Sequence, residues 1–531
     1  MNNPTVALIA FEDFENLGIG YLASVLTEEG FEPIIIDFRL GKKEILKRLD
    51  KLKPLITGFS LVFQYHIYEF KKLIDYLRKG GIKCHFTAGG YYASLRFEEL
   101  FGFIPWLDTI VRFDGEYTLL ELTKCLNSGT DWRKVSGIAF RNKGEIISNP
   151  LRYPETDLDK FPLPKRSPLD NYAFDKRFAT LLAGRGCSNN CSFCNNREYN
   201  KQSSGPIKRI RNPEKVAEEM KFLYQQMDCS VFLFQDDDFP AKHRKGSVWV
   251  DTFCKELTRK KLKDKIMWKI NCRPDEIEYD SFANMKRHGL FLVFLGIDDG
   301  TESGLVRLNK QMSVAKSLEG VNILKQLEIG FDYGFMLFQP STTFISVKEN
   351  LDFLRQICGD GYTPVTYLKL RPYFETRIEK ELREEGRLKG KSGFFDYDFI
   401  EESMNHYFVF TQDCFMEWLT DPDGLVNMSK WAINYIAVIS FYYQMTPDVA
   451  IKSNDVRKTI SESNMFFLDT MRDLGVLFES GKYNDGNYRE LKDYKEKIKS
   501  MHDHYTRQID AFIRKLFLVV EYQELNQLIK Y

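Results

Sequence analysis

Three closely spaced cysteines are the residues of this chain whose types and spacing most clearly indicate chemistry. Cys187, Cys191 and Cys194 lie in the loop 184–194, which opens with Gly-Arg-Gly and follows the apolar run 178–183. This pattern predicts a tight loop at the end of a strand. Thiolates so close together can hold one soft metal centre, and iron–sulfur clusters are normally held by cysteine thiolates, four for a cubane. Three local ligands would leave one iron open to a water, a substrate or a cofactor.

Two other uses of the three thiols are weaker hypotheses. A structural zinc would need a fourth ligand, and neither Cys nor His follows within 30 residues of the loop. Disulfides are disfavoured because three is an odd number and nothing marks the chain as secreted. The remaining cysteines are scattered singly, and each is interpreted as a small buried hydrophobe; they are Cys84, Cys125, Cys229, Cys254, Cys272, Cys358 and Cys414.

With Phe193 before the last cysteine, the Cys-x-x-x-Cys-x-aromatic-Cys loop resembles the signature of the radical S-adenosylmethionine (radical SAM) enzymes. The resemblance implies that Cys187, Cys191 and Cys194 bind a [4Fe-4S] cluster. It also implies that the open iron binds the amino and carboxylate groups of S-adenosylmethionine, with Phe193 beside it. Reductive cleavage of S-adenosylmethionine would then give a 5′-deoxyadenosyl radical, which survives only where water and competing hydrogen donors are excluded.

Composition limits the classes of protein. A chain of 531 residues suggests two or three domains. Lysine plus arginine and aspartate plus glutamate number 75 each, so no basic excess indicates a nucleic-acid partner. The first residues lack the pattern of a signal peptide, and the most apolar later stretch, 431–445, is too short for a membrane span. We therefore expect a soluble cytoplasmic protein without a nucleic-acid partner.

The first 125 residues alternate between strand-like and helix-like runs. Such alternation predicts an α/β domain with a doubly wound parallel sheet, whose ligands bind at the carboxyl ends of the strands. Those ends carry glycine-bearing turns, where backbone can approach a large ligand closely. The candidate binding residues in these turns are Leu17, Gly18, Ser60, Gly89, Gly90, Tyr91, Gly115 and Glu116.

This set of turns resembles the cobalamin-binding domain that precedes many radical SAM enzymes. Two departures stand out: Asn16 replaces the usual proline before Leu-Gly, and Tyr91-Tyr92 replace the usual Pro-His after Gly-Gly. The cobalt-ligating Asp-x-His-x-x-Gly motif is absent, so no histidine of that motif would bind the lower face of cobalamin. The alternative is a flavodoxin-like domain that keeps the shape and has lost the cofactor.

After a connector that contains a short hairpin and five prolines, βα repeats resume. Each proline breaks regular structure. Strands expected at 230–234, 267–270, 291–295, 332–338 and 365–370, after the one before the cysteine loop, predict a partial (β/α)6 barrel with its chemistry at the strand carboxyl ends. The predicted domains are a cobalamin-binding-like domain (1–130), a linker (131–177), a radical SAM barrel (178–392) and a helical C-terminal domain (393–531).

Polar residues follow the barrel strands, where the resemblance places S-adenosylmethionine. Asp236 and Asp237 match paired aspartates that face the methionine amino group, although such turns are usually helix caps. Arg273 could pair with the methionine carboxylate or form a salt bridge within the barrel. Asp298 stands in a Gly-Ile-Asp that resembles the family's Gly-Ile-Glu, and Pro340 in a segment similar to the one beside the adenine.

The C-terminal domain contains no motif. Aromatic residues such as Phe415 and Trp418 recur at helical spacing, which usually indicates core packing. The functional alternative is that these helices cover the open barrel mouth and shape a substrate pocket.

The leading hypothesis from the resemblance is cobalamin-dependent methylation of an unactivated carbon, or of phosphorus, in a small-molecule or peptide substrate. A second S-adenosylmethionine would remethylate the cobalamin, and a flavodoxin or ferredoxin would supply electrons. The runner-up keeps the radical chemistry without methyl transfer, as dehydration, cyclisation or rearrangement. A tRNA methylthiotransferase is disfavoured because its additional N-terminal cysteines are missing. An iron–sulfur electron carrier or a binding scaffold is the non-enzyme alternative.

Overall fold

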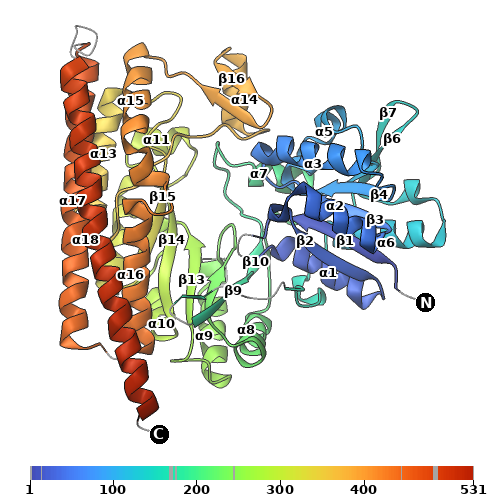
Figure 1. Ribbon diagram of the computed structural model, residues 1–531, viewed down its shortest axis with the longest axis horizontal. Coiled ribbons are helices and arrows are strands. Elements are labelled where there is room, and N and C mark those ends of the chain that lie inside the picture. Colours follow the sequence, from blue (N-terminus) through green and yellow to red (C-terminus); the bar gives the residue numbers. More distant parts are fainter. Residues whose placement is uncertain are drawn as a thin grey trace. The chain divides into compact units, whose positions relative to one another are not determined.

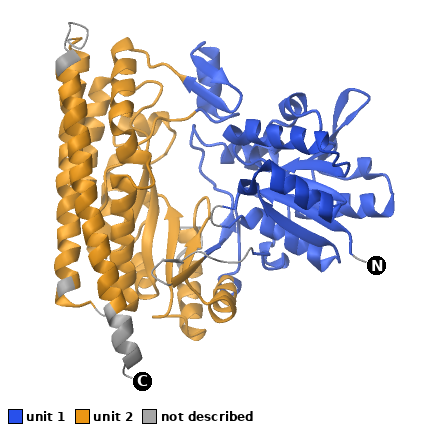
Figure 2. Ribbon diagram, viewed as in Figure 1, with its two compact units in different colours: residues 1–171, 179–215, 372–396 blue, residues 172–178, 216–371, 397–531 orange. Residues whose placement is uncertain are grey.

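The computed structural model describes residues 3–12, 15–166, 172–173, 176–242, 246–443, 445–481 and 488–529. Figure 2 shows two compact units, each built from separate stretches of sequence. The first comprises residues 1–171, 179–215 and 372–396, and the second comprises residues 172–178, 216–371 and 397–531. The four predicted domain boundaries stay a prediction, and Pro168 of the predicted linker lies outside the described residues.

The first unit is built on a seven-stranded sheet with the order β2-β1-β3-β4-β5-β6-β7 (Figure 1). Strands β1 to β5 are parallel, and β6 and β7 are antiparallel. The strands are β1 (Thr5–Ala10), β2 (Glu32–Asp37), β3 (Ile56–Ser60), β4 (His85–Gly89), β5 (Thr109–Val111), β6 (Ile138–Asn142) and β7 (Glu145–Ser148).

Helices cover both faces of this sheet because the side chains of β1 alternate between two cores. Ala7 and Ile9 of β1 belong to one buried cluster, which includes residues of α2 and α3. Val6 and Leu8 belong to the other cluster, which includes residues of α1 and α6. The helices are α1 (Leu17–Glu28), α2 (Gly41–Leu52), α3 (Ile67–Lys79), α4 (Tyr91–Leu95), α5 (Phe97–Phe103) and α6 (Glu116–Ser128).

The hairpin expected in the connector extends the first sheet. β6 pairs with β5, with Thr109 opposite Phe140. Ile138 and Phe140 are buried in the same core as α1 and α6. Alternating apolar residues therefore draw this hairpin onto an edge that the parallel strands leave open.

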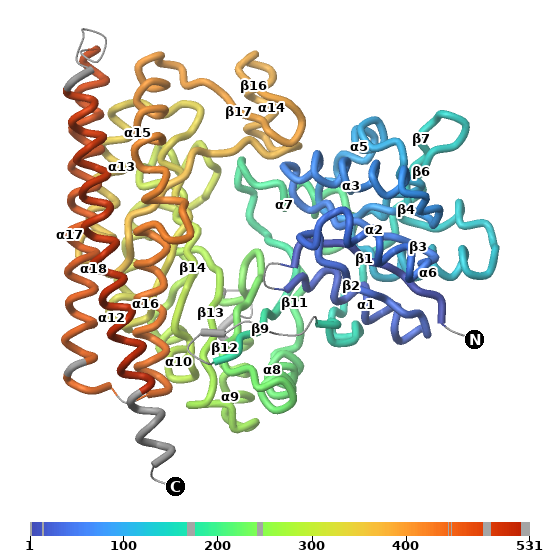
Figure 3. The backbone as a smooth tube through the Cα atoms, in the orientation of Figure 1, coloured from blue at the N-terminus to red at the C-terminus, as the bar shows by residue number. Residues whose placement is uncertain are grey.

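Two later segments complete the first unit. One carries β10 (Gly184–Arg185), α7 (Asn196–Gln202) and β11 (Arg209–Ile210), and the other carries α14 (Arg377–Glu384), β16 (Leu388–Lys391) and β17 (Phe394–Tyr397). Gln64, which is buried, donates to the Pro372 carbonyl at 3.2 Å and accepts from the Phe374 amide at 3.0 Å. Figure 3 traces the chain through α14 and β16, which belong to the first unit.

The second unit contains a six-stranded sheet of order β15-β14-β13-β12-β9-β8. Strands β12 to β15 are parallel, as the predicted barrel requires. The strands are β8 (Tyr172–Ala173), β9 (Lys176–Leu181), β12 (Cys229–Phe234), β13 (Met267–Cys272), β14 (Leu290–Asp298) and β15 (Gly330–Phe335). The helices that follow these strands are α8 (Pro213–Met227), α9 (Gly246–Arg259), α10 (Tyr279–Arg287), α11 (Glu302–Arg307), α12 (Val314–Gln326) and α13 (Phe344–Cys358).

The last predicted strand, 365–370, is reduced to a single parallel bridge between Phe338 and Lys369. Its amides bond to the segment at and beyond the end of β15: Leu368 to the Phe335 carbonyl at 2.8 Å and Leu370 to the Phe338 carbonyl at 2.7 Å. Val365, Tyr367 and Leu370 of this run are buried and Leu368 is exposed. The run pairs past the end of β15 instead of beside it.

Four long helices end the chain: α15 (Glu402–Thr420), α16 (Leu425–Tyr442), α17 (Pro447–Glu479) and α18 (Tyr488–Ile529). Phe415 and Trp418 are buried against Phe467, whereas Trp431 is exposed. At the amino ends of the barrel strands, the Tyr442 hydroxyl donates to the Ser230 carbonyl at 2.7 Å. None of the helices among the described residues is long and apolar enough to cross a membrane.

Candidate functional site

The cysteine loop follows a backbone turn that only glycine allows. Gly186 has φ +82°, and a Cβ atom there would lie 2.0 Å from the Ile207 carbonyl oxygen. Cys187, Cys191 and Cys194 follow, each half-buried. The structure thus places the three thiols in a short loop held closely against the chain that returns towards β11.

Polar contacts hold this loop. The Asn189 side-chain amide donates to Cys187 Sγ at 3.3 Å. The Ile378 amide donates to the Ser192 carbonyl at 3.2 Å, which ties the loop to the start of α14. Hydrogen bonds to cluster sulfurs are among the features that set reduction potentials. A loop already held by such bonds is pre-organised for a soft metal centre.

The donor set fits a cluster better than a single ion. None of the ten cysteines, all of which lie among the described residues, forms a disulfide. Among the described residues, no three His, Cys, Asp or Glu side chains converge to hold one metal ion. In a cubane each thiolate binds a separate iron, so its ligands need not converge on one point. Three thiols around a half-buried loop are the donors that an iron–sulfur centre uses.

A buried ion network attaches the cysteine loop to the first sheet. Arg185, two residues before Cys187, pairs with Glu116 at 2.7 Å and with Asp114 at 3.8 Å. Arg209 pairs with the same Asp114 at 2.5 Å. Burial alone would raise the pKa of Asp114, but the charges of Arg185 and Arg209 hold that pKa below its ordinary value. The charged partners thus join the carboxyl end of β5 to both chains that flank the loop.

An aromatic stack makes a second junction. The ring of Tyr199, on α7 just after the cysteine loop, stacks on Tyr91 with ring centroids 4.0 Å apart. Phe113, which follows β5, lies 5.0 Å from Tyr199. Burial raises the pKa of Tyr199 well above its ordinary value, so its hydroxyl stays neutral at physiological pH. Tyr91 occupies the position where the family has proline, and here it provides a stacking surface.

The turn after β4 also leaves no room for a side chain. Gly90 has φ +105° and ψ 179°, a region that only glycine populates. A Cβ atom at Gly90 would lie 2.7 Å from the Leu61 carbonyl oxygen, at the end of β3. The backbones at the carboxyl ends of β3 and β4 therefore lie against each other with no side chain between them. Such a stretch of backbone is the surface expected for a large ligand.

Replacement of Gly90 with alanine is expected to lower the free energy of unfolding by about 1–3 kcal/mol, the range for a strained backbone residue. The amount of cobalamin bound to the protein after anaerobic expression should also fall. Urea unfolding and cobalt analysis measure the two effects. Gly81→Ala is the control, because Gly81 shares a positive φ, +91°, but has nothing within 4 Å of the added Cβ. Equal losses in both variants would show that the close approach at Gly90 is unimportant.

The residues predicted to bind cobalamin lie at the strand ends where the sequence predicts them. They lie at or just past the carboxyl ends of β3, β4 and β5, with Leu17 and Gly18 opening α1 after β1. Two have partners that the sequence did not indicate: Glu116 binds Arg185, and Tyr91 stacks on Tyr199. Asn16, in place of proline, caps α1 by accepting from the Ile19 amide at 3.1 Å. Contact of these residues with cobalamin remains a prediction.

The residues predicted to bind S-adenosylmethionine, Phe193 excepted, belong to the second unit. Asp236 and Asp237 follow β12, Arg273 follows β13, Asp298 ends β14 and Pro340 follows β15. Because these strands are parallel, all five residues lie at one edge of the sheet. Phe193 lies in the cysteine loop of the first unit. Contact of these six residues with S-adenosylmethionine also remains a prediction.

Arg273 and Asp298 have clear structural partners. Arg273 donates to Asp275 at 2.9 Å and to the Lys310 carbonyl at 2.6 Å. Asp298, with φ +68°, pairs with the buried Lys310 ammonium at 2.6 Å, and the same ammonium donates to the Gly296 carbonyl at 2.9 Å. Lys310 belongs to no motif, so spacing alone could not reveal that it fixes the end of β14.

Replacement of Lys310 with methionine should cost about 3–5 kcal/mol, because it removes one member of a buried ion pair and leaves the Asp298 carboxylate. Urea unfolding at neutral pH measures the change. Lys316→Met is the matched control: Lys316 pairs with Glu319 at 2.6 Å, but both side chains are more than half exposed. The control should change stability by less than about 1 kcal/mol. A similarly small effect for Lys310 would contradict the inferred role.

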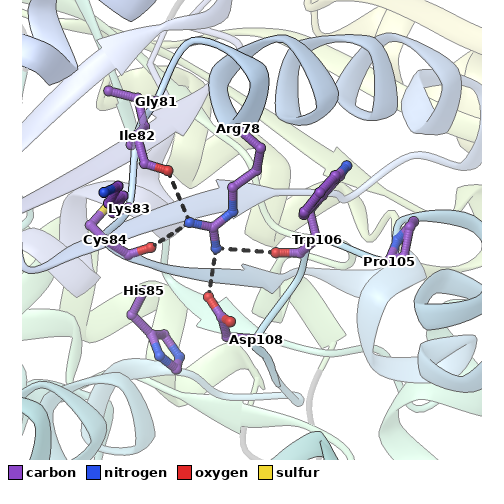
Figure 4. A pocket seen from close by; sticks show the side chains of 9 residues that line it. All are labelled: Arg78, Gly81, Ile82, Lys83, Cys84, His85, Pro105, Trp106 and Asp108. Carbon is purple, nitrogen blue, oxygen red and sulfur yellow. Dashed lines mark hydrogen bonds and ion pairs between the residues drawn. The ribbon is translucent and has the colours of Figure 1, made fainter. Parts of the chain in front are cut away.

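A cavity of about 550 Å³ lies at the amino ends of β4 and β5 and contains none of the predicted site residues (Figure 4). Arg78 lies at the centre of this cavity. Its guanidinium donates hydrogen bonds to the carbonyls of Ile82 and Cys84 at 3.1 and 2.9 Å. The same guanidinium pairs with Asp108 at 2.7 Å. Since doubly wound sheets bind ligands at the opposite strand ends, we assign Arg78 to loop stability.

Comparison with protein families gives two matches. Residues 5–123 match the B12 binding domain, and residues 181–354 match the Radical SAM superfamily. The first range covers the parallel part of the first sheet. The second begins in β9, includes the cysteine loop and ends in α13.

Curated relatives share about a quarter of their residues with this chain. The anaerobic magnesium-protoporphyrin IX monomethyl ester cyclase of Rubrivivax gelatinosus is 26% identical over 68% of this chain and 66% of its own length. The 4′-phospho-dehydrooxetanocin synthase of Priestia megaterium is 24% identical over 66% of this chain and 51% of its own. The hopanoid C-3 methylase of Methylococcus capsulatus is 23% identical over 67% and 66%. The chain thus spans about two thirds or less of these relatives.

Solved structures share the fold. The cobalamin-dependent S-adenosylmethionine radical enzyme OxsB, with aqua-cobalamin and S-adenosylmethionine bound, aligns with a TM-score of 0.68 at 17% identity over 99% of this chain and 81% of its own. The radical S-adenosylmethionine methyltransferase TsrM of Kitasatospora setae, with cobalamin and a [4Fe-4S] cluster bound, aligns with a TM-score of 0.61 at 16% identity over 72% of this chain and 78% of its own. The OxsB alignment includes the C-terminal helices.

Proposed function

The chain belongs to the cobalamin-dependent radical SAM enzymes, and from this premise we propose that it methylates an unactivated carbon, or phosphorus, in a small-molecule or peptide substrate. The predicted family, the three-part α/β fold and the cofactor set of [4Fe-4S] cluster, S-adenosylmethionine and cobalamin are confirmed by the two family matches and by the solved folds. The methylation itself and the nature of the substrate are the proposal.

One observation carries the proposal. The cysteine loop and the carboxyl edge of the B12-type sheet belong to the same compact unit. Glu116–Arg185 and Tyr91–Tyr199 join them by direct contact. When bound, the cluster supplies the electron that cleaves S-adenosylmethionine, and cobalamin supplies a methyl group. A methylase needs these two cofactor sites to keep a fixed separation, and the two junctions provide it.

The side chains of this chain have separate tasks in the proposal. Cys187, Cys191 and Cys194 hold the cluster, and Asn189 donates to one of their sulfurs. Asp236 and Asp237, at the end of β12, suit a cationic amine such as that of S-adenosylmethionine. Buried aromatic rings around Tyr199 exclude water from the junction beside the loop.

A second candidate function is radical cyclisation or rearrangement without methyl transfer. Several relatives favour it by their names, because they are cyclases and a synthase and not methylases. This chemistry shares the cluster and the cleavage of S-adenosylmethionine with methylation. It differs in the fate of the substrate radical, which cyclises or rearranges instead of accepting a methyl group.

The experiment is anaerobic expression in cobalamin-fed cells, followed by iron and cobalt analysis and incubation with methyl-deuterated S-adenosylmethionine and a chemical reductant. The proposal predicts about four irons and one cobalt per chain. Extracts of the source organism supply the substrate in this assay. The deuterated methyl group should then appear in the product. Deoxyadenosine formed with cobalt present but without methyl transfer would favour the second candidate. Iron without cobalt would exclude methylation by cobalamin.

We further propose that a flavodoxin or ferredoxin of the cytoplasm supplies the electron. None of the ten cysteines, all within the described part of the chain, forms a disulfide, which suits a reducing compartment. Reconstitution with such a donor in place of the chemical reductant tests this assignment, since cleavage of S-adenosylmethionine should continue.

A further inference from the structure

A histidine and a glutamate form a close pair beside the predicted cobalamin site. His66 ends the short helix η2 (Gln64–His66), which follows β3, and Glu69 lies in the first turn of α3. His66 Nδ1 is 2.5 Å from Glu69 Oε2. The His66 side chain is 25% exposed, so its surroundings cover most of it and a part stays accessible.

Aromatic contacts fix the orientation of the ring. Phe11, the first residue after β1, stacks on His66 with centroids 4.2 Å apart. Tyr65 lies 4.5 Å from the same ring. A ring held by stacking and by one short hydrogen bond has little freedom to rotate.

The pair also fixes the tautomer. A carboxylate only accepts hydrogen bonds, so Glu69 requires the proton of a neutral imidazole to be on Nδ1. Nε2 then keeps its lone pair. Histidines that bind metals almost always donate their other ring N–H to a carboxylate, a carbonyl or a water in this way, which raises their basicity.

The position of His66 in the sheet matters as much as its chemistry. β3 lies between β1 and β4, so the segments after these three strands are neighbours at one edge. The contact of Phe11 with His66 joins the first two, and the Leu61 amide donates to the Gly89 carbonyl at 2.8 Å to join the second and third. The cobalamin family match covers all three strands. His66 thus follows β3, which ends in Ser60 and whose carboxyl end lies against the backbone of Gly90.

We propose that His66 Nε2 is the lower axial ligand of cobalt in bound cobalamin, with Glu69 as its hydrogen-bond partner. This inference rests on the proposed function, because it requires that the first unit binds cobalamin. The cobalt-ligating Asp-x-His-x-x-Gly motif is absent, and the histidine comes instead from the segment that follows β3. In the ligand exchange, the Nε2 lone pair forms the bond to cobalt, the cofactor's own base or a water leaves with its lone pair, and the Nδ1 proton stays shared with Glu69.

The competing explanation is a surface ion pair at the start of α3. Glu69 is half exposed, and such helical pairs contribute little to stability. A surface pair would leave the electronic structure of cobalt unchanged, so spectroscopy separates the two explanations.

The test is electron paramagnetic resonance of the full-length protein loaded with cob(II)alamin, prepared with ordinary histidine and with ¹⁵N-labelled histidine. Ligation by His66 predicts that nitrogen superhyperfine splitting changes from triplets to doublets on labelling. The variant His66→Phe keeps an aromatic ring against Phe11 and should lose the label-dependent splitting. His85→Gln is the matched control, because His85 begins β4 at the opposite edge and contacts Thr109 at 2.9 Å; its spectrum should remain that of the wild type.

Each result decides between the explanations. Triplets that do not respond to the label would show that the cofactor's own base is bound, and absent splitting would show no nitrogen ligand; both overturn the inference and leave cobalamin binding intact. A protein without cobalt would overturn the proposed function and the inference together. Glu69→Gln should weaken cobalamin retention by about 10-fold, the lower end for loss of a histidine's supporting partner.

Discussion

Replacement of Cys191 with alanine should abolish the iron–sulfur cluster and, with it, the cleavage of S-adenosylmethionine. A site-differentiated cluster has three protein ligands and no spare one, so two thiolates cannot hold the cubane. We expect iron content to fall from about four per chain to a small fraction, and deoxyadenosine formation to fall by at least about 1,000-fold. Iron analysis, visible absorption and product chromatography after anaerobic reconstitution measure these changes. Cys187→Ala and Cys194→Ala should behave alike.

The control for this loss is another cysteine of the same chain. Cys254 is buried, and burial raises the pKa of its thiol to about 12, so it is protonated at physiological pH and unsuited to bind iron. Cys254→Ala should therefore keep full iron and full cleavage. If Cys191→Ala retained both, the assignment of the loop as the cluster site would be wrong.

Local sequence signals predicted much of the architecture. The spacing of Cys187, Cys191 and Cys194 pointed to the radical SAM domain, and the alternation of apolar runs predicted the two parallel sheets, because period and spacing are local properties. The hairpin at 138–148 was recognised as a hairpin, but its pairing with β5 depends on an open sheet edge far along the chain. The sequence shows that residues 365–370 are apolar, but it does not show the segment with which they pair.

The missed functional residues act through contacts distant in sequence. In the sequence Arg185 is only the middle residue of Gly-Arg-Gly, and its partner Glu116 lies 69 positions earlier. Tyr199 belongs to no periodic pattern, yet it stacks on Tyr91, which lies 108 positions earlier. His66 stands outside any cobalt-ligating pattern, since the Asp-x-His-x-x-Gly motif is absent from the chain. The signal available for it was the His-x-x-Glu spacing at a helix start, which brings the two side chains onto one face.

Replacement of Arg185 with methionine should destabilise the first unit by about 3–5 kcal/mol, because it leaves buried carboxylates with too few cations. Glu116 is 5% exposed and loses its 2.7 Å partner, whereas Asp114 keeps Arg209. The double variant Arg185→Met/Glu116→Gln should recover part of the loss, since no uncompensated carboxylate then remains at that pair. Arg133→Met, at a pair with Asp131 that is about half exposed on both sides, is the control and should change little.

The same variant makes a pH-dependent prediction whose sign follows from Asp114. Its folded pKa is lowered, so its ion pairs contribute stability above the unfolded pKa of about 3.9, and that contribution is lost as pH falls through the folded value. Urea unfolding from pH 7 to pH 3 should therefore show the difference between wild type and Arg185→Met at its largest near neutrality and shrinking in acid. A difference that is constant over this range would mean that Arg185 stabilises the junction by packing alone. In that case its charge would not link the cysteine loop to the B12-type sheet, and the cluster would keep its electron paramagnetic resonance signal unchanged in Glu116→Gln.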